Sequence, residues 1–445
     1  SAAEDSYERL IFPSISREIR NALTDRASQG AIHNFALNLK PLLMQPPVKG
    51  FVTMGLDPGY RNGCKVAVVD ATGKVLDTAV VYPTFSERKK QEAIAALSVL
   101  MRKHNVRHIA IGNGTASRET EAMTVELLRS FPDASYAIVN EAGASVYSAS
   151  PLAAEEFPNY DVNLRSAVSI ARRLQDPLAE LVKIDPKAIG VGQYQHDCPQ
   201  KELDAALGAV VEDCVNAVGV DVNTASRSLL EQVSGLNSTT AKNIVLYREE
   251  NGPFTSRSQL KKVPKLGPKA FEQCAGFLRV PESKEILDNT GVHPESYPAA
   301  KALLKLLNTA DCTTLPRQLE AYGSAKAACD CGVGEPTLID IVKELAKPGR
   351  DPRQTIQVFA FDPTVKTIED LKEGQVLPGI VTNITNFGCF VDVGIKENGL
   401  VHISELADRF VSDPTQVVSI HQHVKVKVLS VDLSRKRVQL SMKGI

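Results

Sequence analysis

One short pattern occurs twice in the centre of the chain, at an interval of 30 residues, from Leu230 to Leu260. In each copy an apolar segment leads into a four-residue turn, and a second apolar segment with helical spacing follows at once. The first copy comprises Leu230, Val233, Ser234-Gly235-Leu236-Asn237, Ala241 and Ile244. The second comprises Leu260, Val263, Pro264-Lys265-Leu266-Gly267 and Ala270. We therefore expect two consecutive helical hairpins between residues 226 and 280.

The turn residues indicate that each turn starts a helix. Asn237 is a favourable N-cap, because its side-chain oxygen can accept hydrogen bonds from free backbone amides. Pro268 suits the first position of a helix, where its missing N–H leaves no hydrogen bond unmade. Exposed amides at such a position can bind a phosphate. The pattern resembles a tandem helix-hairpin-helix module, which binds nucleic acids without sequence specificity.

The local charge favours the same interpretation. The basic residues of this stretch are Arg227, Lys242, Arg248, Arg257, Lys261, Lys262, Lys265, Lys269 and Arg279, against Glu231, Glu249, Glu250 and Glu272. The predicted phosphate-binding residues are Gly235, Leu236, Asn237, Lys242, Lys265, Gly267 and Lys269. Family members usually have Gly at both hairpin positions, whereas Asn237 and Lys265 each replace one here. A purely structural four-helix packing unit is the alternative.

A length of 445 residues predicts three or four domains. The net charge is -1, so any nucleic-acid binding must come from local basic surfaces. The eight cysteines are scattered and lack a second zinc-spaced pair, which indicates reduced thiols in a cytoplasmic protein. No apolar run reaches membrane length. We expect no cofactor, no metal, no membrane association and no small-molecule substrate.

Residues 51–180 alternate between strand and helix patterns in the order βββαβαβ. The expected strands cover residues 51–56, 65–69, 75–82, 108–111 and 137–139. Asp57 follows the first strand and Glu141 follows the last. This order resembles the RNase H-like fold, in the branch of the junction resolvases and the YqgF family. Its nucleases hold two Mg²⁺ ions between three or four carboxylates, and the resemblance matches Asp57 and Glu141 with the first two ligands.

The third ligand of that family is expected at the start of the next helix. Residues 163–168 offer Arg165 there and no carboxylate, and a cation at this place disfavours Mg²⁺. Asp161 and Asp176 lie nearby but outside the pattern. We therefore expect a retained fold with two vestigial carboxylates and no catalysis. The alternative is a metal-dependent nuclease or resolvase acting on structured nucleic acid.

Other polar segments receive structural interpretations. The loop of residues 112–115 lacks the Lys and Ser/Thr of a P-loop and the third Gly of a dinucleotide loop, so we expect a tight strand-to-helix turn. Residues 190–197 contain an adjacent His and Asp but no recognisable nucleophile. On the helix that ends before Pro177, Arg172 and Arg173 are expected to be exposed.

Five short strands with alternating polarity are expected near the C-terminus, over residues 376–384, 388–393, 400–403, 424–432 and 437–441. With a helical piece between the third and fourth, they predict an OB-fold β-barrel. Residues 387–392 and 399–404 resemble an S1-type RNA-binding domain, in which two aromatic residues and a His stack on bases beside a basic residue. Phe387, Phe390, His402 and Arg437 match these positions. Stacking contributes ~1–3 kcal/mol per base and tolerates any sequence.

The order of the three modules resembles the Tex family of bacterial transcription accessory proteins. Further similar stretches are residues 55–59, 111–119, 141–148, 211–216 and 271–278. Tex proteins carry an additional N-terminal helical region, and residues 1–50 look like its end. The resemblance implies a multidomain α+β protein with an RNase H-like α/β domain, a helical helix-hairpin-helix region and a C-terminal OB-fold barrel.

The expected parts are a helical end (1–50), an RNase H-like domain (51–180), a helical region with the hairpins (181–280), a connecting domain (281–370) and an S1-type domain (371–445). The expected function is that of a nucleic-acid-binding transcription accessory factor. It would bind phosphate backbone through the hairpins and single-stranded RNA or DNA through the barrel, with RNA polymerase or the ribosome as a further partner. A third interpretation is that the RNase H-like part is a docking scaffold for RNA polymerase or the ribosome.

Overall fold

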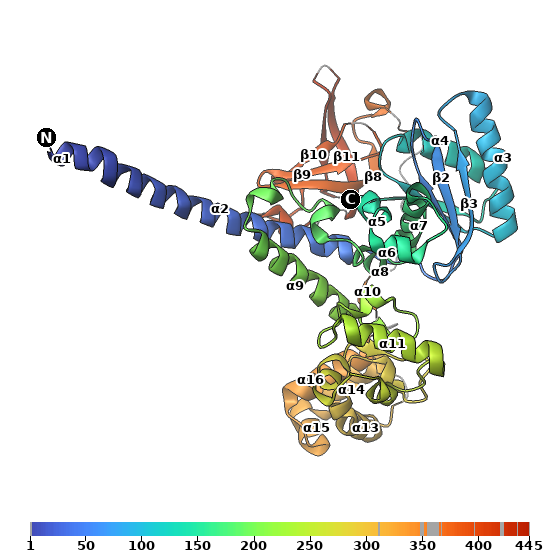
Figure 1. Cartoon of the computed structure of the whole chain (residues 1–445), viewed down its shortest axis with the longest axis vertical. Helices are drawn as coiled ribbons and strands as arrows, with labels where there is room; N and C mark the ends of the chain where they lie inside the picture. Colours follow the sequence, from blue (N-terminus) through green and yellow to red (C-terminus); the bar gives the residue numbers. More distant parts are fainter. Residues whose placement is uncertain are drawn as a thin grey trace. The chain divides into compact units, whose positions relative to one another are not determined.

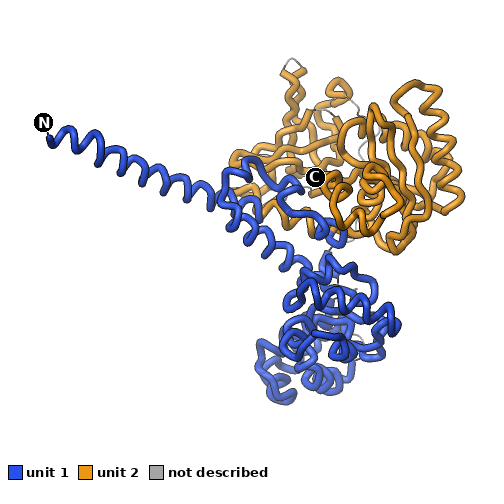
Figure 2. Tube along the Cα trace, in the orientation of Figure 1, with its two compact units in different colours: residues 1–36, 178–354 blue, residues 37–177, 355–445 orange. Residues whose placement is uncertain are grey.

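The computed structural model describes residues 2–309, 312–347, 351–353, 365, 367–395, 397–418, 422–433 and 435–444. Part of the predicted connecting domain therefore lies outside the described residues. The chain forms two compact units (Figures 1 and 2): unit 1 comprises residues 1–36 and 178–354, and unit 2 comprises residues 37–177 and 355–445. Within the described residues, no helix combines the length and apolar character that crossing a bilayer requires.

The chain begins with a long helical segment (Figure 1). It consists of α1 (Ala2–Ser6), a π-helical turn η1 (Tyr7–Ile11) and α2 (Phe12–Leu43). Pro41 lies in the last turn of α2, and the helix ends shortly after it, as expected. Leu39 and Leu43 are fully buried, whereas Ile15 and Leu23 are exposed. Only the end of α2 therefore contributes to a core.

Unit 2 contains a five-stranded sheet with the order β3-β2-β1-β4-β5. Its strands are β1 (Thr53–Asp57), β2 (Cys64–Val69), β3 (Val75–Val81), β4 (His108–Gly112) and β5 (Ser135–Val139). The helices are α3 (Glu87–His104), α4 (Ser117–Leu128), α5 (Ala144–Ser148), α6 (Pro151–Glu156) and α7 (Val162–Gln175). A Cβ atom on Gly55 of β1 would lie 2.2 Å from the carbonyl oxygen of Ala167, so α7 crosses the sheet in direct contact with β1. The predicted βββαβαβ order is confirmed.

The helical hairpins lie in unit 1. Its elements up to residue 279 are α8 (Pro177–Leu181), α9 (Gln200–Val218), β6 (Val220–Asp221), α10 (Arg227–Leu230), α11 (Ser238–Asn251), α12 (Pro268–Cys274) and β7 (Leu278–Arg279). Asn237 caps α11 as predicted, and its side chain accepts hydrogen bonds from the amides of Thr239 and Thr240, each at 3.0 Å. Pro268 lies in the first turn of α12, also as predicted.

Four helices follow the tandem hairpins. They are α13 (Tyr297–Leu306), α14 (Leu315–Tyr322), α15 (Ser324–Cys331) and α16 (Glu335–Ala346). Leu303, Leu315 and Leu338 are fully buried in their shared core. Apolar residues at helical spacing predict helices over residues 299–307 and 337–345, which correspond to α13 and α16. The two short helices between them are not predicted, since eight residues give too few repeats of a helical period.

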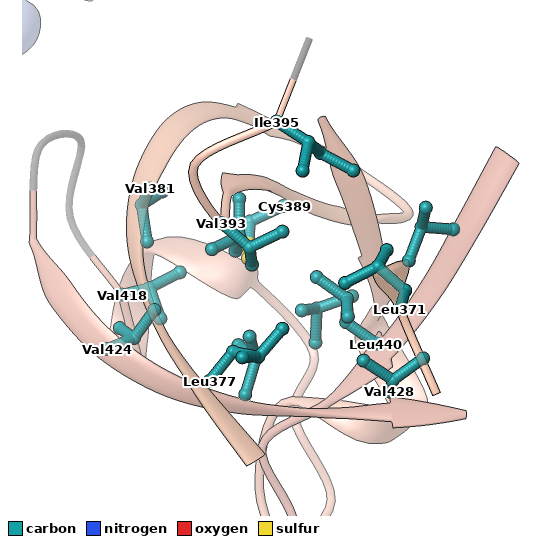
Figure 3. Packing of buried hydrophobic residues seen from close by; sticks show 14 of the residues in the cluster. Leu371, Leu377, Val381, Cys389, Val393, Ile395, Val418, Val424, Val428 and Leu440 are labelled. Carbon is teal, nitrogen blue, oxygen red and sulfur yellow. The ribbon is translucent and has the colours of Figure 1, made fainter. Parts of the chain in front are cut away.

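The C-terminal strands close into a barrel with the order β10-β12-β11-β8-β9. They are β8 (Val376–Thr385), β9 (Gly388–Asp392), β10 (Gly399–His402), β11 (His423–Asp432) and β12 (Arg437–Ser441). Figure 3 shows Leu377, Val381, Cys389 and Leu440 pointing into the barrel, where each is almost completely buried. The multidomain α+β architecture, with an OB-fold barrel at its end, is as predicted.

Candidate nucleic-acid interface

Two aromatic rings and an imidazole lie together on the outside of the barrel. Leu400 of β10 pairs with Phe390 of β9, and His402 pairs with Gly388. Phe387 is 50% exposed, and its ring centroid lies 6.3 Å from that of Phe390 at an interplanar angle of 86°. We call Phe387, Phe390 and His402 the stacking surface, because exposed rings on neighbouring strands of an OB barrel can stack on unpaired bases.

Local contacts fix the orientation of this surface. Nδ1 of His402 lies 2.9 Å from the Ser404 hydroxyl and 3.3 Å from the Ser404 amide, so Ser404 holds the imidazole in place. The amide of Ile403 donates to the carbonyl of Phe387 at 2.8 Å. Gly388 has a φ of +149°, and a Cβ there would lie 2.1 Å from the carbonyl oxygen of Val401. Glycine is therefore required between the two phenylalanines.

Arg437 lies on the same strand layer but further from the rings. It begins β12, where it pairs with Asp432 of β11, while Gln439 lies beside Leu400 of β10. Both Arg437 and Gln439 are exposed and alternate with buried Val438. Their side chains therefore point outward, and Leu400 lies between Gln439 and Phe390 across the three strands.

The second hairpin, residues 264–267, is open to solvent. Lys265, Gly267 and Lys269 are exposed, and Lys265 adopts a left-handed backbone with φ +66°. Lys242, on the first turns of α11, is exposed as well. Asn243 of α11 donates to the carbonyl of Pro264 at 2.7 Å, which ties the first copy of the repeat to the second turn. Lys242, Lys265 and Lys269 are therefore all accessible to solvent around the second hairpin.

The first hairpin, residues 234–237, is largely closed by neighbouring helices. The amide of Ser234 donates to Oδ1 of Asn216 on α9 at 3.2 Å, and the Ser234 hydroxyl donates to the Glu212 carboxylate. Gly235 has φ +83°, and a Cβ on it would lie 2.5 Å from Cβ of Gln273. This turn is therefore less open to solvent than the second one, because Glu212 and α12 lie against it. Leu236 is half-buried and Asn237 is exposed.

Two of the nine basic residues cannot reach a phosphate. Arg257 is 1% exposed and Arg279 is 9% exposed. The Arg257 guanidinium donates to the carbonyls of Leu278 and Thr290 at 2.8 and 2.6 Å and to the hydroxyl of Tyr297 at 2.7 Å. It is a structural residue that joins the tandem hairpins to α13.

A third hairpin was not predicted. Gly332 has φ +70° and Gly334 is the N-cap of α16, with Pro336 in the first turn. This backbone matches the second hairpin, where Lys265 and Gly267 hold the equivalent places. The signal was present in the sequence as Gly-Val-Gly-Glu-Pro. Its tip carries Glu335, which accepts a hydrogen bond from Ser324, so its charge is unsuited to a phosphate.

Asp57 and Glu141 are brought together at the ends of β1 and β5. Burial, and secondly the charge of Glu141, raise the pKa of Asp57 from 3.8 to about 6, although Lys65 opposes the shift. Burial also raises the pKa of Glu141, against the Gly114 amide and Arg173. Oε2 of Glu141 is buried and has no hydrogen-bond partner within the described residues. A Cβ on Gly114 would lie 1.7 Å from Oε1, so the predicted tight turn also accommodates this carboxylate.

The cations beside these carboxylates are Lys65 and Arg173, not Arg165. Arg165 donates to the carbonyls of Tyr160 and Ser148 at 3.1 and 3.2 Å. Arg173 is 3% exposed, so the expectation that it faces solvent is wrong, and it donates to the carbonyl of Asn140 at 2.8 Å. Arg173 is buried because it lies on the face of α7 that packs against the sheet.

The remaining nearby carboxylates have structural roles. Asp161 caps α7 by accepting from the amide of Leu164 at 2.8 Å, and Asp176 pairs with Lys49 at 2.9 Å. Across the described part of the chain, no group of three or more His, Cys, Asp or Glu side chains has a geometry that could hold a metal ion.

Known families and relatives match almost the whole chain. The family models are "Tex protein YqgF-like domain" over residues 51–175, "Helix-hairpin-helix motif" over 215–279, "HHH domain" over 285–353 and "S1 RNA binding domain" over 370–443. "Protein tex" of Bordetella pertussis is 55% identical over 437 residues, 97% of this chain and 55% of the relative. "Transcriptional accessory protein Tex" of Neisseria gonorrhoeae is 56% identical over 441 residues, 98% of this chain and 58% of the relative.

The chain belongs to the Tex family. "Protein YhgF" of Escherichia coli is 55% identical over 432 residues, which are 96% of this chain and 56% of the relative. The chain thus spans little more than half the length of these Tex relatives. The match to an HHH domain over residues 285–353 agrees with the third hairpin.

Proposed function

We propose that this Tex-family chain is a nucleic-acid-binding accessory factor of transcription. The observation that carries the proposal is the stacking surface, where two phenylalanine rings and His402 lie together outside a closed barrel. Arg437 on β12 adds a cation to the same outward layer. The second hairpin supplies a separate phosphate-binding site, with its exposed amides and Lys242, Lys265 and Lys269. Gly235, Leu236 and Asn237 then serve mainly to position α11.

Both surfaces recognise features common to all nucleic acids. Rings stack on any base, and lysines and amides bind any phosphate. We therefore propose binding without sequence specificity, with a preference of the barrel for single strands. The name of the Neisseria relative supports a role in transcription, and RNA polymerase or the ribosome is the proposed cytoplasmic partner.

The test is equilibrium binding of labelled single-stranded RNA and DNA across a salt series. The double variant Phe390→Ala with His402→Ala should bind single strands about tenfold or more weakly. Lys265→Gln with Lys269→Gln should instead weaken duplex binding and reduce its salt dependence, since fewer counterions are released. Unchanged single-strand affinity in the first variant would show that the stacking surface is wrongly assigned.

We also propose that the RNase H-like domain does not cleave nucleic acid. Its two carboxylates face the cations Lys65 and Arg173, and within the described residues no third carboxylate completes a metal-binding group with them. A two-metal nuclease needs several ionised carboxylates. Incubation with four-way junctions and Mg²⁺ or Mn²⁺ should give no products. Metal-dependent cleavage that Asp57→Asn abolishes would establish the nuclease alternative.

A further inference from the structure

Phe410 has the most exposed large hydrophobic side chain among the described residues, at 93%. It lies in the segment between β10 and β11 of the barrel. Its sequence neighbours Asp408, Arg409 and Ser412 are exposed polar residues, so the ring is flanked along the chain by polar side chains. The barrel core does not use this ring, and leaving it in water forgoes the free energy that burying a phenylalanine would contribute.

The backbone on both sides of Phe410 is fixed to the barrel. Leu406 is 2% exposed and Val411 is 7% exposed, and both belong to the barrel core. Just before them, the carbonyl of Glu405 accepts from the amide of Met442 at 2.8 Å, and its carboxylate accepts from Ser441 at 2.7 Å. Ala407 packs against the core as well, so residues 408–410 form the exposed segment between two anchored positions.

The projecting segment is continuous with the stacking surface. His402 caps the short helical turn η9 (Ile403–Glu405), and the amide of Ile403 donates to the carbonyl of Phe387 at 2.8 Å. The segment that carries Phe410 thus follows His402 directly, and the hydrogen bond from Ile403 ties its start to Phe387. Arg409 adds an exposed cation next to the ring.

We propose that Phe410 is a further base-stacking residue, which holds one more nucleobase of a single strand bound on the stacking surface, with Arg409 beside the adjoining phosphate. This inference rests on the proposed function. An isolated ring among polar groups suits a base, which needs one flat apolar face, better than a protein interface, which needs an apolar core around its anchors.

The experiment measures the affinity of the full chain for fluorescein-labelled oligouridylates of about 4, 8 and 12 nucleotides. Phe410→Leu keeps an apolar side chain but removes the aromatic face, whereas Phe410→Tyr keeps the face. We expect the Leu variant to bind the longer oligonucleotides about five- to tenfold more weakly and the shortest one like the wild type. The Tyr variant should bind all of them like the wild type. Because Phe410 is exposed, both variants should unfold at the wild-type temperature.

The double variant of Phe390 and His402 separates the two claims. If it weakens binding at every length while Phe410→Leu changes nothing, Phe410 does not contact the strand, and a protein partner is the remaining occupant of this ring. If neither variant changes the affinity, the barrel does not bind single strands through this surface, and the proposed function of the barrel fails together with the inference. If Phe410→Leu and Phe410→Tyr lose the same affinity, the inference is also overturned, because Tyr keeps the aromatic ring that stacking requires.

Discussion

At the scale of single residues, Asp57 carries its charge at a cost to folding. Its pKa is raised from 3.8 to about 6, chiefly by burial. The folded chain therefore holds this proton more tightly than the unfolded chain does. The resulting stabilisation is fully present below about pH 4 and is lost as the pH rises through about 6.

Asp57→Asn should remove this pH dependence and raise the free energy of unfolding at pH 7 by about 1–3 kcal/mol. Urea unfolding of both proteins between pH 4 and pH 7 measures the difference. Asp133→Asn is the matched control, because the Asp133 side chain is 84% exposed. A variant that follows the wild-type pH profile would contradict the assigned pKa.

Arg257 is a residue whose role the sequence could not show. It counts as one more cation in a basic stretch, but its guanidinium contacts Leu278 and Tyr297, which follow 21 and 40 positions later. Tyr297 in turn donates to Asp288 at 2.7 Å. Contacts between residues so distant in sequence have no local pattern, so only the folded chain reveals them.

Arg257→Met should lower the free energy of unfolding by about 3–5 kcal/mol, because it leaves four buried backbone carbonyls, including that of Asp288, without their donor. Denaturant unfolding measures this loss. Lys262→Met also replaces a cation with Met, but at an exposed site, and should alter stability by less than about 0.5 kcal/mol. Equal effects of the two substitutions would refute the structural role of Arg257.

At the scale of elements, the local sequence was sufficient to predict the helical hairpins and the strands of the barrel. Asn237, Pro268 and the alternating strands act through neighbours in the chain or through a regular period, so their signals are visible in the sequence. The first hairpin is partly covered because its Ser234 bonds to Glu212 and Asn216 of α9. The negative charges of Asp57 and Glu141 are opposed by the positive charges of Lys65 and Arg173. These are tertiary contacts, and motif matching cannot predict them.

Lys265 offers a test that separates conformation from charge. Its φ of +66° is unfavourable for a residue with a side chain, so Lys265→Gly should stabilise unit 1 by up to about 1 kcal/mol. The same change should weaken duplex binding, because it removes a cation from the second hairpin. Thermal unfolding and binding anisotropy measure the two effects. Asn tolerates this backbone better than Lys does, so Lys265→Asn should lose the same affinity with a smaller gain in stability. If the Gly variant is less stable than the wild type, the backbone of Lys265 is not strained.

At the scale of the whole molecule, the two proposed binding surfaces belong to different compact units. The second hairpin lies in unit 1 and the barrel lies in unit 2. A duplex with a single-stranded tail can offer a ligand to each, so it should bind about 10²-fold or more tightly than either part alone. The affinities of the duplex, the tail and the joined molecule test this. Lys265→Gln with Lys269→Gln should reduce the joined molecule to the affinity of the tail, and affinity no greater than the better single part would exclude simultaneous binding.

Separate attachment points also affect how the protein leaves its ligand. When one contact dissociates, the other keeps the polymer nearby, and the released surface can rebind at a new position before the complex is lost. Complete escape then requires both contacts to open at once, whereas stepwise relocation requires only one. If both proposed surfaces bind, the division into two units would let this chain move stepwise along a strand without returning to bulk solution.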